Sequence, residues 1–158
     1  MYGAAALTSI DQYLYGKFEV VLKASGIPGV ITGFFLHRNS PRQEIDIEIA
    51  GNRPSRLIVN VFYNPGCIGS SFEYGYRGSP TYIDLGFDTS KSYHQYTIEW
   101  TPSAISWFVD NALVHKRVEW CPTPIPHLPM HIHMNAWLSR SKELAGRVVK
   151  RRLPTSAS

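Results

Sequence analysis

Three carboxylates alternate with isoleucines in the segment Glu-Ile-Asp-Ile-Glu at residues 44–48. Successive side chains of an extended strand point to opposite faces, so Glu44, Asp46 and Glu48 would share one face, about 6.6 Å apart along the chain. The isoleucines can be buried against a core, whereas burying the acids there would cost a large desolvation free energy. We therefore expect a strand that concentrates negative charge on one side, which folding itself does not require.

Cleavage of a glycosidic bond requires two carboxyl groups, one ionised and one protonated. The Cα atoms of Glu44 and Glu48 would lie roughly 13 Å apart, and the side chains could bring the carboxyl groups to about 5–7 Å. That range includes both retaining and inverting separations. A solvated strand face could show the same alternation, so the pattern alone leaves both interpretations open.

A second segment shows the same division between its two faces. His131, His133, Asn135 and Trp137 alternate with apolar residues. Aromatic and polar groups on one face suit a sugar, and a tryptophan among polar groups is unusual for a solvated face. A His-x-His pair can also chelate a metal ion. The next glutamate is Glu143, too far along the chain to complete such a site, so no metal is expected.

Short β-like segments recur between turn signals, which is typical of a sandwich or barrel. The expected strands span residues 16–23, 30–37, 43–50, 56–63, 81–85, 94–100, 104–110, 112–117 and 130–138. Asp110-Asn111 has the composition of a tight turn between two of them. Only residues 141–150 show a weak helical period. The sequence therefore predicts an all-β sandwich.

Length and composition limit the classes of protein. The 158 residues predict one domain, and 44% hydrophobic with 18% charged residues is typical of a globular chain. No apolar run approaches the ~20 residues of a membrane span, so no membrane partner is expected. The net charge of +4 is concentrated near the end, at Arg147, Lys150, Arg151 and Arg152. No nucleic-acid-binding signature accompanies this cluster, so we expect a solvated end and no nucleic-acid partner.

The two cysteines and the first residues give weaker signals. Cys67 and Cys121 match no metal motif, and we expect them to be free or buried rather than bridged. Residues 1–7 lack the basic start and apolar core of a secretion signal.

The acidic strand lies within a series of recognisable sequence blocks. They are residues 15–20 (YGKFEV), 33–36 (GFFL), 85–88 (LGFD), 93–102 (YHQYTIEWTP), 105–111 (ISWFVDN) and 134–137 (MNAW). In this order and spacing, the blocks closely resemble glycoside hydrolase family 16, the group of lichenases, laminarinases and xyloglucan transglycosylases. The resemblance covers roughly residues 13–137. It implies a β-jelly-roll (concanavalin A-like) sandwich with a concave substrate cleft.

The resemblance also implies roles for the three acids. The family is retaining, and its activity here would be endo-acting cleavage of a β-linked polysaccharide such as a β-glucan. Glu44 would be the nucleophile and Glu48 the general acid/base. Asp46 would hydrogen-bond the nucleophile and help to keep the pKa values of the two glutamates apart.

Two further segments match family positions that bind substrate. Asn135 and Trp137 correspond to the M-N-x-W motif that lines the subsites of lichenases. Asn60 and Phe62 correspond to an N-x-Y segment, in which phenylalanine here replaces tyrosine and removes a hydroxyl group.

One aromatic position of the family is absent. A tryptophan often precedes the catalytic strand, but this chain has Pro-Arg-Gln at 41–43, so Arg42 or His37 would take its place. Trp100 and Trp107 match family blocks, but alternation could place either in the core. The expected substrate-binding residues are Arg42, Asn60, Phe62, His133, Asn135 and Trp137.

The ends of the chain differ from the family pattern. Members usually have further strands before residue 13 and after the last tryptophan region, so we expect the domain at 1–158 to be incomplete at both termini. Exposed sheet edges are templates for pairing, which favours a homo-oligomer. A structural calcium ion is often held partly by these ends, so no cofactor is expected here. The resemblance implies an extracellular or periplasmic location.

Three other functions stay open. A transglycosylase would use a sugar hydroxyl instead of water on the same covalent intermediate. A non-catalytic carbohydrate-binding protein could use the same fold, although a lectin has no need of all three acids. Binding of an anion or nucleic acid through the basic end would be strongly salt-dependent.

Overall fold

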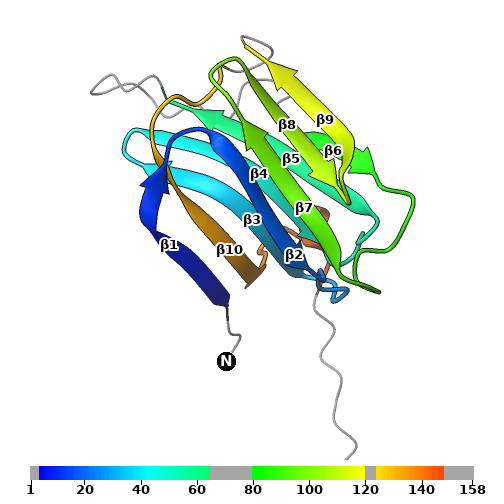
Figure 1. The fold of residues 1–158 in the computed structure, drawn as a ribbon. Helices are drawn as coiled ribbons and strands as arrows, with labels where there is room; N and C mark the ends of the chain where they lie inside the picture. The colour runs from blue at the N-terminus through cyan, green and yellow to red at the C-terminus, as the bar shows by residue number, and fades with distance from the viewer. Residues whose placement is uncertain (1–3, 65–79, 120–123, 148–158) are drawn as a thin grey trace, which may run out of the picture.

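The computed structural model describes residues 4–64, 80–119 and 124–147, which form two antiparallel sheets packed face to face (Figure 1). In sheet order, the larger sheet contains β1 (Ala5–Tyr13), β10 (Met130–Leu138), β3 (Val30–Asn39), β4 (Arg42–Ala50), β5 (Arg56–Tyr63) and β6 (Thr81–Asp84). The smaller sheet contains β2 (Gly16–Leu22), β7 (His94–Trp100), β8 (Ala104–Val109) and β9 (Ala112–Val118).

One short helix, α1 (Lys142–Ala145), follows β10. Among the described residues, no helix has the length and apolar character that crossing a membrane requires. Cys67, Cys121, Lys150, Arg151 and Arg152 lie outside the described residues, so the expectations for them stay predictions.

The all-β sandwich prediction is confirmed, and each of the expected strands is present with its ends shifted by at most a few residues. The sequence did not reveal β1. Eight of its nine residues are exposed, so no apolar face marks it as a strand. Its place at the edge comes from antiparallel pairing with β10, a contact between distant parts of the chain.

The core lies between the two sheets, and β4 supplies its isoleucines. Ile45, Ile47 and Ile49 are buried on the inner face, opposite the fully buried Trp100 and Trp107 of the smaller sheet. Burying each isoleucine contributes about 1.5–3 kcal/mol. Trp107 also donates a hydrogen bond from Nε1 to the backbone oxygen of Asp46, at 3.1 Å. Both tryptophans therefore belong to the core, and one of them fixes the middle of the acidic strand.

A buried amide fixes the beginning of the same strand. Gln43 is fully buried, and its Oε1 accepts hydrogen bonds from the backbone nitrogens of His127 (2.9 Å) and Leu128 (3.2 Å). Its Nε2 donates to the backbone oxygen of Asn64, at 3.1 Å. Successive side chains of a strand alternate between its two faces, so the inward position of Gln43 places the next residue, Glu44, on the opposite face.

The side of the sandwich next to β1 carries uncovered apolar surface. Leu7 and Val21 are exposed by 66% and 64%, and Leu7 lines an open hollow of about 430 Å³ together with Leu22 and Met134. Within the described residues, β1 pairs only with β10, and β2 pairs only with β7. The structure therefore combines two unpaired strand edges with an apolar hollow.

We expect this surface to cause concentration-dependent self-association, because unpaired edges and apolar surface both favour contact with a second copy. Light scattering at micromolar concentration measures it. Leu7→Gln should shift the chain toward the monomer, whereas Leu113→Gln, on the exposed edge strand β9, should have a smaller effect. A stable wild-type monomer across the concentration range would contradict the prediction.

Candidate active site

Glu44, Asp46 and Glu48 lie on one face of β4, the face turned away from the core. Neighbouring strands extend this face in register: His37 and Phe62 flank Glu44, Phe35 and Asn60 flank Asp46, and Gly33 and Ile58 flank Glu48. Residues of β10 and β1 continue it beyond β3. The predicted acidic stripe is therefore at the centre of the larger sheet.

The acids are more buried than a solvated strand face would leave them. Glu44 is 9% exposed and Asp46 is 4% exposed, and Glu48 is partly buried. Arg42 and His37, which neighbour Glu44 on the same outer face, lie against its carboxylate. Burial of three carboxyl groups side by side disfavours ionising all of them together.

Arg42 provides the countercharge for Glu44. Its Nε and Nη2 donate to the same carboxylate oxygen, Oε2, at 2.9 and 2.6 Å. The guanidinium also lies 4.7 Å from the centre of the Phe62 ring. Two charge-assisted bonds from a fixed guanidinium suit an ionised carboxylate. Arg42 was expected to bind substrate; in the structure it is engaged with Glu44, and a substrate contact stays a prediction.

Asp46 lies between the two glutamates and differs from both. Burial, followed by the negative charges of Glu44 and Glu48, raises its pKa well above the usual range of an aspartate. A hydrogen bond with the Glu44 side chain raises this pKa further. The hydrogen bond between the two carboxyl groups requires a proton on one of them, and the raised pKa of Asp46 favours Asp46 as the donor to Glu44.

Glu48 has the properties of a general acid. Burial, with a smaller contribution from the charge of Glu44, raises its pKa to about 7. The neighbouring position on β3 is Gly33, where a Cβ atom would lie 2.5 Å from Oδ1 of Asn135. Glycine thus leaves room for the Asn135 amide next to Glu48.

Several polar atoms on this face are buried without a hydrogen-bond partner. Among the described residues they include Oδ1 of Asp46, Nε2 of His133 and Oδ1 of Asn135. Leaving such an atom unpaired costs about 1–3 kcal/mol. Unpaired atoms on β4 and β10, with β3 between them, are consistent with a polar ligand that binds across the strands.

The expected binding residues do not all lie at the acids. Asn60 and Phe62 are directly beside them, and His133 and Asn135 are two strands away on the same face. Trp137 pairs with Ile31 and packs, partly buried, against a small apolar cluster that includes Ala145 of α1. It therefore lies beyond the row of Glu48, near the end of the face.

Sequence reasoning gave little weight to β3 and none to β1. His37 is directly opposite Glu44, with Nε2 4.0 Å from its Oε2, and was considered only as a substitute for a missing aromatic residue. The alternation of Phe35 and His37 with Phe34 and Leu36 could have identified this face. Thr8, whose Oγ1 lies 3.0 Å from His133 Nδ1, had no such signal.

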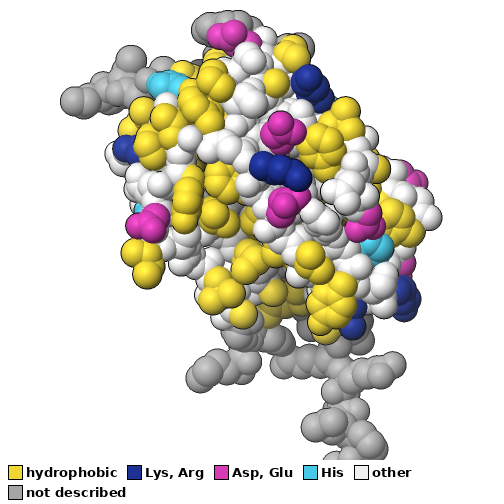
Figure 2. Space-filling view, in the orientation of Figure 1, with side chains coloured by type: hydrophobic (Ala, Val, Ile, Leu, Met, Phe, Trp, Pro, Cys, Tyr) yellow, Lys and Arg dark blue, Asp and Glu magenta, His cyan; other side chains and the backbone are white. Residues whose placement is uncertain are grey.

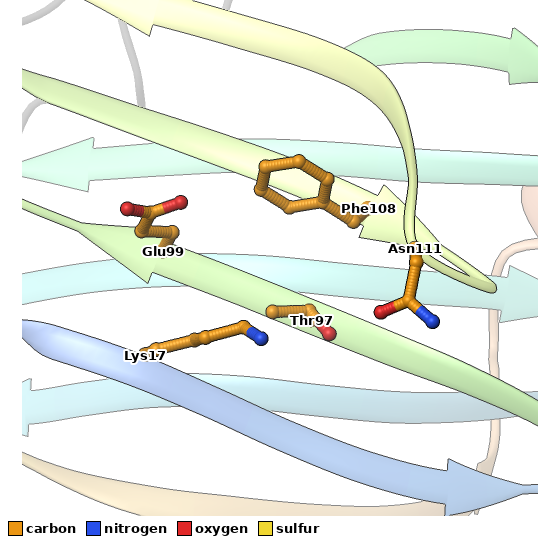
Figure 3. A pocket seen from close by; sticks show the side chains of 5 residues that line it. All are labelled: Lys17, Thr97, Glu99, Phe108 and Asn111. Atoms are coloured by element: carbon orange, nitrogen blue, oxygen red, sulfur yellow. The ribbon is translucent and has the colours of Figure 1, made fainter.

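A different hollow lies on the outer face of the smaller sheet, lined by Lys17, Thr97, Glu99, Phe108 and Asn111 (Figure 3). Acidic and basic side chains stand close together on this side of the molecule (Figure 2). A nearby carboxyl, Glu19, is exposed, and its hydrogen bond with Lys17 lowers its pKa. An exposed, ionised carboxylate does not supply a proton near neutral pH, so the face of β4 is the better catalytic candidate.

Metal binding has no support on these faces. Within the described ranges, no three His, Cys, Asp or Glu side chains gather closely enough to hold a metal ion. The expectation that the chain uses no cofactor, a structural calcium ion included, stays a prediction.

Comparison with known proteins identifies the family. The family model described as glycosyl hydrolases family 16 matches residues 2–151. A β-glucanase of Brevibacillus brevis is 36% identical over 142 residues, which are 86% of this chain and 49% of that protein. The chain therefore spans about half the length of the curated relatives that it matches.

Solved structures agree with this match. The Bacillus licheniformis β-glucanase superimposes with a TM-score of 0.78 and 30% identity, covering 93% of this chain and 64% of that one. The Crh5 transglycosylase superimposes with a TM-score of 0.73 and 25% identity, covering 85% and 54%. With a family model that matches nearly its whole length, this chain belongs to glycoside hydrolase family 16.

Proposed function

We propose that this chain is a retaining, endo-acting glycoside hydrolase that cleaves a β-linked polysaccharide, with a β-glucan as the favoured substrate. One observation carries the proposal: on a single face, Glu44 is paired with a guanidinium while the pKa of Glu48 is raised to about 7. These are the two protonation states that double displacement requires. The β-glucanases among the relatives support the choice of polymer.

In the first step, a Glu44 oxygen would attack the anomeric carbon and form a glycosyl ester. The glycosidic C–O bond breaks, and Glu48 gives its proton to the leaving oxygen. In the second step, Glu48 would remove a proton from water, whose oxygen displaces Glu44. Asp46 would stabilise the charge on Glu44 through its hydrogen bond when Glu44 departs.

Transglycosylation is the second candidate. In that reaction a sugar hydroxyl, rather than water, would attack the glycosyl ester. The structural likeness to the Crh5 transglycosylase supports this second candidate. Because a large polysaccharide does not cross a membrane unaided, we place either reaction outside the cytoplasm, in the extracellular or periplasmic space.

The proposal is tested by incubating the chain with lichenan, laminarin, xyloglucan and a sulfated galactan. Release of reducing ends in short, mixed products from lichenan or laminarin would support endo-hydrolysis. Products longer than the starting saccharide would instead support transglycosylation. Binding without any change in the products would favour the non-catalytic alternative.

The pH dependence of kcat/KM is expected to be bell-shaped. As the pH rises through about 7, Glu48 loses the proton that it must donate, so the rate falls on the basic side. Double displacement also needs an ionised carboxylate as the nucleophile, which acid removes, so the rate falls on the acidic side as well. Initial rates from mildly acidic to mildly basic pH measure the profile, and a flat curve would argue against two-carboxylate catalysis.

A further inference from the structure

We propose that His37 binds a hydroxyl group of an uncharged sugar unit on the β3 side of the acidic stripe, and that His133 and Thr8 are positioning residues for it. This inference rests on the proposed function, since it concerns the sugar next to Glu44. It adds a specificity-determining residue on β3 and gives β1 a role in the cleft.

The position of His37 is the first argument. It lies directly across from Glu44 on the next strand, with its Nε2 4.0 Å from Oε2 of that carboxylate. Its side chain is 24% exposed, so a ligand bound over the acids can reach it. No hydrogen bond to a described residue engages either of its ring nitrogens. Both nitrogens are therefore available to a ligand.

The chemistry of His37 favours a neutral hydroxyl group. Burial lowers its pKa, and Arg42 and His131 lower it further, while the charge of Glu44 opposes them. The charge on Glu44 is already balanced by Arg42. The neutral imidazole has one donor and one acceptor, which matches a sugar hydroxyl rather than a sulfate or carboxylate.

The ring of His133 supports His37 from β10. It stacks on Phe35 at 4.9 Å with an angle of 5° between the planes, and it meets the His37 ring edge-to-face at 5.5 Å. On its other side, His133 Nδ1 is hydrogen-bonded to Thr8 Oγ1, at 3.0 Å. The edge strand β1 thus fixes His133, and His133 in turn limits the orientation of His37.

His131 links β10 to β1 and does not support His37 in the same way as His133. Its Nδ1 donates to the backbone oxygen of Ser9, and its Nε2 accepts from the Gln12 amide, each at 3.0 Å. A carbonyl oxygen can only accept, so the proton is on Nδ1. Both nitrogens are used in joining β10 to β1, so His131 has no ring nitrogen left to offer a sugar.

The test measures lichenan kinetics for His37→Phe, which keeps an aromatic ring and removes both nitrogens. KM should rise about three- to tenfold, the loss of one neutral hydrogen bond, with kcat changed less than about twofold. Thr8→Val should raise KM by a smaller factor. Thr8→Ser, which keeps the hydroxyl group, should leave KM at the wild-type value. His115→Phe, on β9 outside the cleft, is the matched control and should leave both constants unchanged.

A readout without catalysis separates this inference from the proposed function. The imidazole signals of His37 are followed by NMR while the wild-type chain is titrated with a tetrasaccharide from lichenan. Perturbed signals without hydrolysis would reject the proposed function and retain the subsite. Hydrolysis with unmoved signals and an unchanged KM in His37→Phe would reject the subsite alone. Neither binding nor hydrolysis would reject both.

Discussion

Glu44→Gln is expected to lower kcat on the preferred polysaccharide by on the order of a thousandfold or more, while the fold is retained. The amide has nearly the same shape as the carboxylate, but it does not form a stable ester with the sugar. It also loses the charge to which Arg42 donates two bonds, so the ion pair between Arg42 and Glu44 is lost. Initial rates, with circular dichroism to verify folding, measure the effect.

The role of nucleophile is tested more directly by removing the side chain. Glu44→Gly should be rescued in part by azide, which can occupy the vacated space and attack the anomeric carbon from the same side. The product would then be a glycosyl azide of inverted configuration. Glu19→Gln, which changes an exposed carboxylate on β2, is the control and should keep full activity. Activity of Glu44→Gln close to that of the wild type would remove Glu44 from the mechanism.

The sequence was most informative where burial differs between the two faces of a strand. In β4 the isoleucines and acids alternate, so the residue types alone were enough to assign the inward and outward faces. The same holds for the apolar positions of β10, such as Ile132 and Met134, which pack against the core. Here the physical cause of the pattern acts residue by residue along one strand.

The sequence was least informative where contacts join distant segments. The His37–Glu44 pair depends on the register of β3 with β4, and the Thr8–His133 bond depends on β1 pairing with β10. Neither register can be predicted from the residue types of the local segment. β1 is exposed on both faces, so its hydroxyl and amide side chains resemble those of a loop.

The electrostatics of the site needed the structure for another reason. Three acids in one stripe indicate mutual repulsion, but not which of them keeps its proton. Arg42 was expected to face substrate, yet its bond to Glu44 singles out that residue as the ionised one. Burial then raises the pKa values of Asp46 and Glu48. The assignment of nucleophile and acid stays a prediction, and these contacts are the physical argument for it in this chain.

Glu48→Gln is expected to slow cleavage of the polysaccharide by roughly a hundredfold to ten-thousandfold, the usual contribution of a general acid. The loss should be much smaller for aryl glycosides with good leaving groups, because a phenolate that is already stable needs no proton to depart. The basic limb of the pH profile should also disappear, since glutamine does not titrate near pH 7, where the carboxyl of Glu48 does.

The dependence on the leaving group separates this role from a general loss of structure. A misfolded variant would lose activity equally on all substrates, whereas loss of the acid affects only those that need protonation. Glu99→Gln, on the outer face of the smaller sheet, is the matched control and should leave both the rates and the basic limb intact. Equal, mild losses for Glu44→Gln and Glu48→Gln on every substrate would mean that the two carboxyl groups do not divide the chemistry between them, and the two-glutamate assignment would have to be abandoned.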